Sequence, residues 1–210
     1  MKVVIVGGVA GGATAAARIR RLDEKAEIVV FERSGYISYA NCGLPYYIGD
    51  VITDAEELTL QTPESFNSRF RVDMRVHHEV TAIHPEKKTV SVKNLKTGEE
   101  FEESYDKLIL SPGAKPTQPR FSGTKLDKVF TLRTVEDTLR IKKYINQNHP
   151  KSVVLAGGGF IGLELAENLR ELGMDVTIVQ NGKQLMNLFD HDMASFIHNE
   201  MRKHGVKLAL

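Results

Sequence analysis

The stretch VVLAGGGFIG at residues 153–162 decides the fold of this chain. It starts as an apolar run and turns through Gly157, Gly159 and Gly162, which fit the pattern Gly-x-Gly-x-x-Gly. A helix-like stretch follows at residues 163–172, and a second apolar run occupies residues 176–179. Strand, glycine turn, helix and strand make up the βαβ unit of a parallel sheet, which we therefore predict here.

The stretch VVIVGGVAGG at residues 3–12 repeats this arrangement, with a helix-like stretch at 13–22 and an apolar strand at 28–31. Val9 takes the middle position, so only Gly7 and Gly12 fit the pattern. A loop of this kind brings backbone N–H groups and the positive end of a helix dipole against a diphosphate. Two copies in the same context predict an α/β chain with two Rossmann-like nucleotide-binding units.

The residue that ends the second strand of each unit adds to this interpretation. Glu32 lies twenty residues after Gly12, where a carboxylate accepts hydrogen bonds from an adenosine ribose. The matching residue of the second copy is Gln180, which also accepts a ribose hydroxyl and does not repel a 2′-phosphate. Because Lys183 follows close by and suits such a phosphate, the pattern leaves NADH and NADPH both open.

The sequence between the two copies predicts other secondary structure. We expect a β-meander over residues 72–105, a buried parallel strand at 107–110 and a linker at 115–123. A polar helix over 134–148 and a last strand at 206–210 complete the prediction.

Composition narrows the function. The 210 residues carry a net charge of +1, which favours neither nucleic acid nor an anionic membrane as a partner. No apolar run is long enough to span a bilayer, and the N-terminal run reaches glycine too soon for a signal peptide. A single cysteine excludes an internal disulfide and indicates a cytoplasmic protein. We interpret His77 and His78 as surface or strand residues and expect no metal site.

The single cysteine, Cys42, lies in the segment SYANCGLPY at residues 38–46. An isolated cysteine is usually a buried, inert thiol, and that is the alternative here. Gly43 and Pro45 instead indicate a turn into a helix with Cys42 near its start. A thiolate there attacks disulfides, and without a second cysteine its oxidised form is a mixed disulfide with a small thiol or a sulfenic acid.

Together, the first glycine loop, the segment 38–46 and the stretch ESYDKLILSPGA at 103–114 resemble the pyridine nucleotide-disulfide oxidoreductases, with Thr131-Leu132-Arg133 as a further match. The chain is most similar to the coenzyme A-disulfide reductases, including those fused to a rhodanese domain, and Val9 is usual in that subgroup. The resemblance implies a glutathione-reductase-like flavoprotein, truncated because the family's members are about twice as long. Its domains are then the first part of a FAD domain (1–115), a linker and helix (116–150) and a partial NAD(P)H domain (151–210).

The resemblance implies three groups of site residues, besides the catalytic Cys42. The FAD site takes Gly7, Gly8, Val9, Ala10, Gly11, Gly12, Glu32, Arg33, Asn41, Val80, Ser111, Gly113 and Arg133. The NAD(P)H site takes Gly157, Gly159, Phe160, Ile161, Gly162, Glu164 and Gln180. The coenzyme A site takes Thr14, Arg18, Arg21, Ser38 and Asn41.

A helical pattern supports coenzyme A independently. Thr14, Arg18 and Arg21 stand at i, i+4 and i+7, which places a hydroxyl and two guanidinium groups on one helix face suited to phosphates. A plain solvated basic face is the alternative.

The implied reaction is reduction of coenzyme A disulfide, or of a coenzyme A persulfide, by NAD(P)H through FAD and Cys42, in a full-length homodimer. One rival is an NADH oxidase or peroxidase that uses a cysteine sulfenic acid. Such relatives typically carry histidine where this chain has Ala10, which cannot donate a proton. The other rival is a non-catalytic nucleotide-binding fragment.

Overall fold

The computed structural model describes residues 1–117 and 126–210, which form two compact units. The first unit comprises Met1–Ala40 and Thr59–Lys115, and the second comprises Asn41–Leu58 and Pro116–Leu210. The segment that carries Cys42 thus belongs to the same unit as the second glycine loop. Most of the predicted linker lies outside the described residues.

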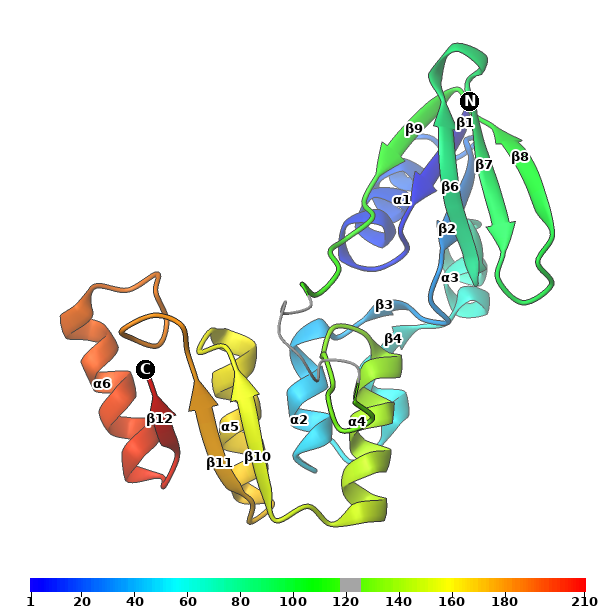
Figure 1. The fold of residues 1–210 in the computed structure, drawn as a ribbon. Coiled ribbons are helices and arrows are strands. Elements are labelled where there is room, and N and C mark those ends of the chain that lie inside the picture. The colour runs from blue at the N-terminus through cyan, green and yellow to red at the C-terminus, as the bar shows by residue number, and fades with distance from the viewer. Residues whose placement is uncertain (118–125) are drawn as a thin grey trace. The chain divides into compact units, whose positions relative to one another are not determined.

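A parallel four-stranded sheet in the order β5-β2-β1-β9 forms the first unit's centre (Figure 1). Its strands are β1 (Lys2–Val6), β2 (Glu27–Glu32), β5 (Asp73–Val76) and β9 (Lys107–Leu110). The unit's helices are α1 (Ala10–Leu22) and α3 (Pro63–Phe70), and β3 (Ile37–Tyr39) pairs antiparallel with β4 (Thr59–Gln61).

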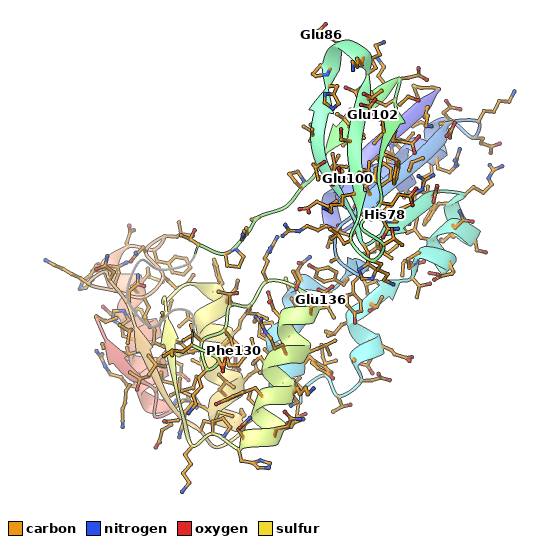
Figure 2. The ribbon with its side chains drawn as sticks, turned by 45° about the vertical axis from the view of Figure 1, so that its right-hand side comes forward. His78, Glu86, Glu100, Glu102, Phe130 and Glu136 are labelled. Atoms are coloured by element: carbon orange, nitrogen blue, oxygen red, sulfur yellow. The ribbon has the colours of Figure 1, made fainter. Side chains whose placement is uncertain are left out.

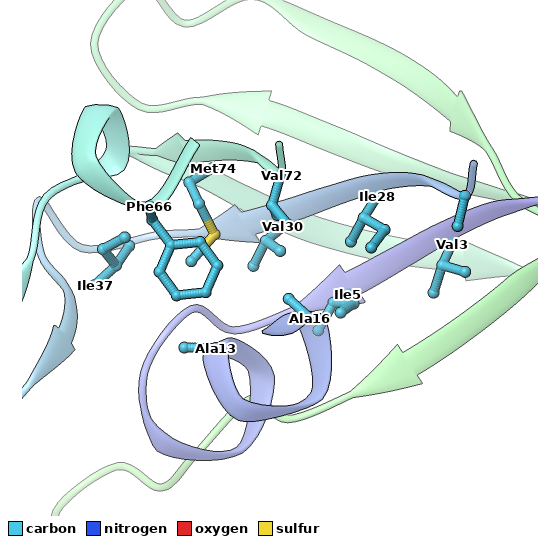
Figure 3. Packing of buried hydrophobic residues seen from close by; sticks show 11 residues of the cluster. Val3, Ile5, Ala13, Ala16, Ile28, Val30, Ile37, Phe66, Val72 and Met74 are labelled. Carbon is cyan, nitrogen blue, oxygen red and sulfur yellow. The ribbon is translucent and has the colours of Figure 1, made fainter. Parts of the chain in front are cut away.

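Alternating side chains of β1 and β2 give this sheet two apolar faces. On one face, Val3 and Ile5 belong to one buried cluster with residues of α1 and with Phe66 of α3 (Figure 3). The alanines that α1 turns inward, Ala13 and Ala16, are buried, and their small size allows the helix to lie close to the strands. The sequence prediction of a strand followed by a packed helix is therefore confirmed.

The opposite face of the sheet is covered by the antiparallel strands β6 (His78–His84), β7 (Thr89–Asn94) and β8 (Glu100–Ser104), with the short helix η3 (Pro85–Lys87) between the first two. The predicted meander is thus confirmed from His78 onward. It was placed too early, because residues 73–76 pair parallel with β2. His78 (Figure 2) packs its ring against Phe31 and Phe101 and donates to the carbonyl of Val76 at 2.7 Å.

The predicted strand at 107–110 exists and pairs parallel with β1, but its burial was predicted wrongly. Leu110 is 56% exposed, and Leu108 and Ile109 are only partly buried. The physical reason is position, because among the described residues β9 is an edge strand that pairs with β1 alone.

The second unit holds a parallel sheet in the order β10-β11-β12. Its strands are β10 (Ser152–Ala156), β11 (Asp175–Val179) and β12 (Lys207–Ala209). Its helices are α2 (Leu44–Ile48), α4 (Val135–Asn148), α5 (Phe160–Glu171) and α6 (His191–Lys203), with short helices η1 (Asn41–Gly43) and η2 (Ala55–Leu58). Ile48, Leu169, Ile178 and Leu185 lie in its core. Within the described ranges, no helix has the length and apolar character needed to cross a membrane.

The two glycine-loop helices begin earlier than the sequence predicted. We expected α1 from residue 13 and α5 from residue 163, whereas they begin at Ala10 and Phe160. The last glycine of each loop, Gly12 and Gly162, therefore lies inside the first turn of its helix. Glycine disfavours a helix when judged locally, so this start depends on how tightly the helix meets the preceding strand.

Candidate functional site

The first glycine loop is a turn that no larger residue could form at its two ends. Gly7 has a φ of +97°, and its N–H donates to the carbonyl of Phe31 at 2.8 Å. A Cβ on Gly7 would overlap the carbonyl of Ser111, and a Cβ on Gly12 would overlap the carbonyl of Gly7. The turn therefore brings strand β1, helix α1 and the end of β9 into backbone contact.

The second loop repeats the same construction. Gly157 has a φ of +112° and donates its N–H to the carbonyl of Val179 at 2.9 Å. A Cβ on Gly162 would overlap the carbonyl of Gly157. Gly7 and Gly12 of the first loop thus have structural counterparts in Gly157 and Gly162, and the sequence repeat is also a repeat of backbone geometry.

The residue that ends the second strand holds each loop by the same hydrogen bond. The Glu32 carboxylate is buried and accepts the N–H of Gly8 at 2.7 Å, while its other oxygen accepts the N–H of Ser34 at 2.8 Å. In the second unit the Gln180 Oε1 accepts the N–H of Gly158 at 3.0 Å. The Gln180 amide group consequently turns its Nε2, a donor, away from the loop.

The N-termini of the helices that follow the two loops have features suited to binding an anion. Neither α1 nor α5 has a side-chain cap or an acidic residue in its first turn. By contrast, Thr62 and Thr134 close the N-termini of α3 and α4 with capping boxes. A helix N-terminus without a cap leaves N–H groups that a phosphate satisfies, so the first and second loops both fit a dinucleotide diphosphate.

Two predicted site residues lie at the first loop, Ser38 of the coenzyme A group and Ser111 of the FAD group. Ser38, with a φ of +44°, donates its N–H to the carbonyl of Gly8 at 3.0 Å. Ser111 follows β9 and donates its N–H to Val6 at 2.8 Å, and its side chain lies beside Gly11. These contacts place both serines at the first loop.

Other predicted FAD residues make contacts of their own. Arg33 is exposed and lies 3.9 Å from the Glu79 carboxylate on the meander, where Val80 also lies. Gly113 is exposed with a φ of +71°, and Arg133 precedes α4 with its N–H bonded to Asp137 at 3.0 Å.

The coenzyme A stripe was predicted on one helix face, and its three residues do lie on α1. Thr14, Arg18 and Arg21 are all exposed, and the two arginines form no ion pair with any residue that the structure describes. Arg20 differs, because it binds the backbone carbonyls of Phe70 and Arg71 at 2.8 Å each. Arg18 and Arg21 are therefore available to a ligand, and Arg20 is structural.

Cys42 lies in η1, directly before α2, and its thiol is free and exposed. The alternative of a buried, inert thiol is thus wrong. The neighbouring Asn41 has a buried Oδ1 with no hydrogen-bond partner among the described residues. A buried acceptor without a donor is costly in a folded protein, and a bound ligand with an N–H or O–H would satisfy it.

The helix after Cys42 is held by contacts that the sequence did not reveal. Lys142 of α4 is buried and donates from Nζ to the carbonyl of Ile48 at 2.9 Å. The same Nζ forms an ion pair with the Asp50 carboxylate at 2.6 Å. Gly49 lies so close to Asn168 of α5 that a Cβ would overlap the amide. No local pattern marks these partners, because they are far apart in the chain.

The fold and these sites define a class of protein with two dinucleotide-binding loops and one exposed cysteine at a helix start. A family model described as pyridine nucleotide-disulphide oxidoreductase matches residues 1–210. The chain belongs to this family.

Among known proteins, the chain is 45% identical over 209 residues to a coenzyme A disulfide reductase of Staphylococcus aureus (strain NCTC 8325 / PS 47), covering 100% of this chain and 47% of that protein. The crystal structure of reduced Bacillus anthracis CoADR-RHD matches with a TM-score of 0.96 and 52% identity, over 99% of this chain and 38% of that one. A NAD-dependent persulfide reductase from A. fulgidus matches with a TM-score of 0.95 and 34% identity, over 100% and 39%. The chain thus spans about half the length of the curated relatives it matches.

Proposed function

We propose that this chain is the nucleotide-binding and redox-cysteine part of an enzyme that reduces coenzyme A disulfide, or a coenzyme A persulfide, with NAD(P)H. The observation that carries the proposal is Cys42, a free and exposed thiol at a helix start, in a chain with two repeated dinucleotide loops. The likeness to coenzyme A disulfide reductases supports the substrate class.

In this proposal each loop has one cofactor. The first loop, with Glu32 and Ser111, holds the ADP part of FAD, since its buried carboxylate suits a ribose and its uncapped helix suits a diphosphate. The second loop holds NAD(P)H, with Gln180 at the adenosine ribose. The Asn41 Oδ1 accepts a hydrogen bond from bound ligand, which satisfies its buried oxygen.

The chemistry of the chain itself centres on Cys42. Its thiolate attacks one sulfur of the disulfide, a sulfur–sulfur bond forms, and one coenzyme A leaves as thiolate. When bound, FAD supplies a two-electron relay between NAD(P)H and sulfur. Two electrons and one proton then convert the Cys42 mixed disulfide to thiolate and free coenzyme A. One NAD(P)H and one proton are consumed for each disulfide, and two coenzyme A thiols are released.

We assign binding of the coenzyme A phosphates to side chains of α1. Arg18 and Arg21 are exposed, form no ion pair with a described residue, and share a face with Thr14. A guanidinium–phosphate contact is charge-assisted and worth about 1.5–3 kcal/mol, and less where water and salt screen it. Loss of one arginine should weaken use of coenzyme A disulfide by roughly ten- to a hundredfold, at about 1.4 kcal/mol per tenfold.

The experiment compares Arg18→Ala and Arg21→Ala with the unaltered, flavin-loaded protein. The substrates are coenzyme A disulfide, cystine, which has no phosphate, and hydrogen peroxide. A loss confined to coenzyme A disulfide supports the proposal. Equal losses on all three substrates would assign the arginines to folding or flavin binding. No loss on coenzyme A disulfide, together with strong peroxide turnover, would favour a peroxidase instead.

Two further assignments accompany the function. The single cysteine leaves no internal disulfide to form, which suits a reducing compartment, and we assign the protein to the cytoplasm. We also propose that the full-length enzyme is a homodimer, which sedimentation of the purified protein would test.

A further inference from the structure

A buried histidine lies behind the second glycine loop. His198 of α6 is 7% exposed, and its Nε2 accepts the backbone N–H of Leu185 at 2.9 Å. A ring nitrogen that accepts a hydrogen bond carries no proton, so the imidazole is neutral in this arrangement. The histidine therefore fixes the backbone of a segment thirteen residues before it in the chain.

The segment held by His198 is the one that supports the loop. Met186 donates its N–H to the carbonyl of Gly158 at 2.8 Å. The Leu185 side chain packs directly on Gly158, because a Cβ added there would overlap it. Both residues are buried, and Met186 has a φ of +50°. The segment is thus held in one conformation against the loop.

Gly158 in turn orients Gln180, the residue that we propose to bind the adenosine ribose. Its N–H donates to the Gln180 Oε1 at 3.0 Å. A continuous set of contacts therefore runs from His198 through Leu185 and Met186 to Gly158 and Gln180.

We propose that His198 is a positioning residue for nicotinamide-nucleotide binding, because its neutral ring holds Leu185 and Met186 against Gly158. This inference rests on the proposed assignment of the second loop to NAD(P)H. His198 itself does not touch the nucleotide, and its effect is on the placement of the loop and of the Gln180 amide.

The charges around the ring make this support dependent on pH. Burial lowers the pKa of His198 below its ordinary value of about 6.5, and the positive charges of Arg202 and His191 on the same helix lower it further. Lys183 and Asp190, the charged residues of the loop between β11 and α6, form no described ion pair with the ring.

The lowered pKa of His198 determines how its support of the loop depends on pH. A histidine whose folded pKa is lowered contributes stability that is present above its unfolded pKa and is lost as the pH falls through the folded pKa. Protonated Nε2 would place its own N–H against the N–H of Leu185, with donor facing donor. The support of the loop should therefore be lost as the pH falls through the lowered pKa of His198, which lies below the ordinary value of about 6.5.

The test measures the dissociation constant of NADH in the flavin-loaded protein between about pH 8 and pH 5.5. NADH is used because it lacks the 2′-phosphate, whose second pKa is about 6. The variants are His198→Leu, which removes the acceptor, and His198→Gln, which keeps one. His204→Gln is the matched control, because His204 follows the same helix, is exposed, and has a side chain that hydrogen-bonds Glu200 in the part of the chain that the structure describes.

We expect His198→Leu to weaken NADH binding roughly fivefold to twentyfold at pH 8, with flavin content unchanged. His198→Gln should bind within about twofold of the unaltered protein at pH 8 and lose the weakening at low pH. If His198→Leu does not fold, the pH profile of His198→Gln decides alone.

A purely structural role would lower the melting temperature of the variants and leave the pH profile of NADH binding as it is. Unaltered NADH affinity in both variants, or an acid weakening that persists in His198→Gln, would overturn the inference while the proposed function stands. An unaltered protein that binds flavin but no nicotinamide nucleotide would overturn both.

Discussion

Gly162→Ala is the sharpest test of the second loop. The methyl group would lie closer than 3.0 Å to the carbonyl oxygen of Gly157, a separation that real Cβ atoms do not adopt. The obstacle is backbone rather than a flexible side chain, so the turn between β10 and α5 must open. Gly157 cannot yield easily, because its φ of +112° and its bond to Val179 already fix it.

The expected cost can be worked from the contacts that depend on this turn. Overpacking a filled site costs about 1–3 kcal/mol. Opening the turn also strains two hydrogen bonds of Gly158, to Gln180 at 3.0 Å and from Met186 at 2.8 Å, each worth about 1 kcal/mol. We expect a loss of stability of about 2–4 kcal/mol and NADH binding at least tenfold weaker, with the flavin retained.

The assay pairs urea unfolding with a titration of NADH against the flavin-loaded protein. Gly159→Ala is the matched control for the unfolding measurement alone, because a Cβ on Gly159 meets nothing within 4 Å and its φ of −89° suits alanine, whereas Gly159 is itself a predicted NAD(P)H residue. It should change stability by less than about 0.5 kcal/mol. If Gly162→Ala unfolds at the same urea concentration and binds NADH as tightly as the unaltered protein, the reasoning about the loop is refuted.

Three further predictions concern other residues. Cys42→Ser should bind flavin normally and lose disulfide reduction, since a hydroxyl cannot form the mixed disulfide; near-normal turnover would remove Cys42 from the mechanism. Gln180→Glu should raise the ratio of kcat/KM for NADH over NADPH at least tenfold, because a carboxylate repels the 2′-phosphate. If the unaltered protein already preferred NADH over NADPH by more than about a thousandfold, that reasoning would be contradicted. Lys142→Met should destabilise the chain by about 1–3 kcal/mol in urea unfolding, since it leaves the carbonyl of Ile48 without its donor. Asp50→Asn is its control, with a smaller effect because Asp50 is exposed.

The sequence by itself determined the elements whose signals are local. Apolar β-branched runs gave the parallel strands, and the glycines at 7, 12, 157 and 162 gave the two turns, because only glycine fits a positive φ or a backbone overlap there. The sequence also predicted that Glu32 and Gln180 occupy equivalent positions, since each stands at the end of the strand that follows a glycine loop and its helix. The turn and helix around Cys42 followed from Gly43 and Pro45.

Only the tertiary structure decided which elements became neighbours. Residues 73–76 joined the parallel sheet instead of the meander, and β9 became an exposed edge. Lys142 meets Ile48 across 94 positions of the chain, and His198 meets the backbone of Leu185. Neither pair leaves a periodic trace, because such contacts are set by how helices pack on a sheet. The glycine loops were therefore evident from local chemistry, whereas the side chains that support them depended on packing between distant segments.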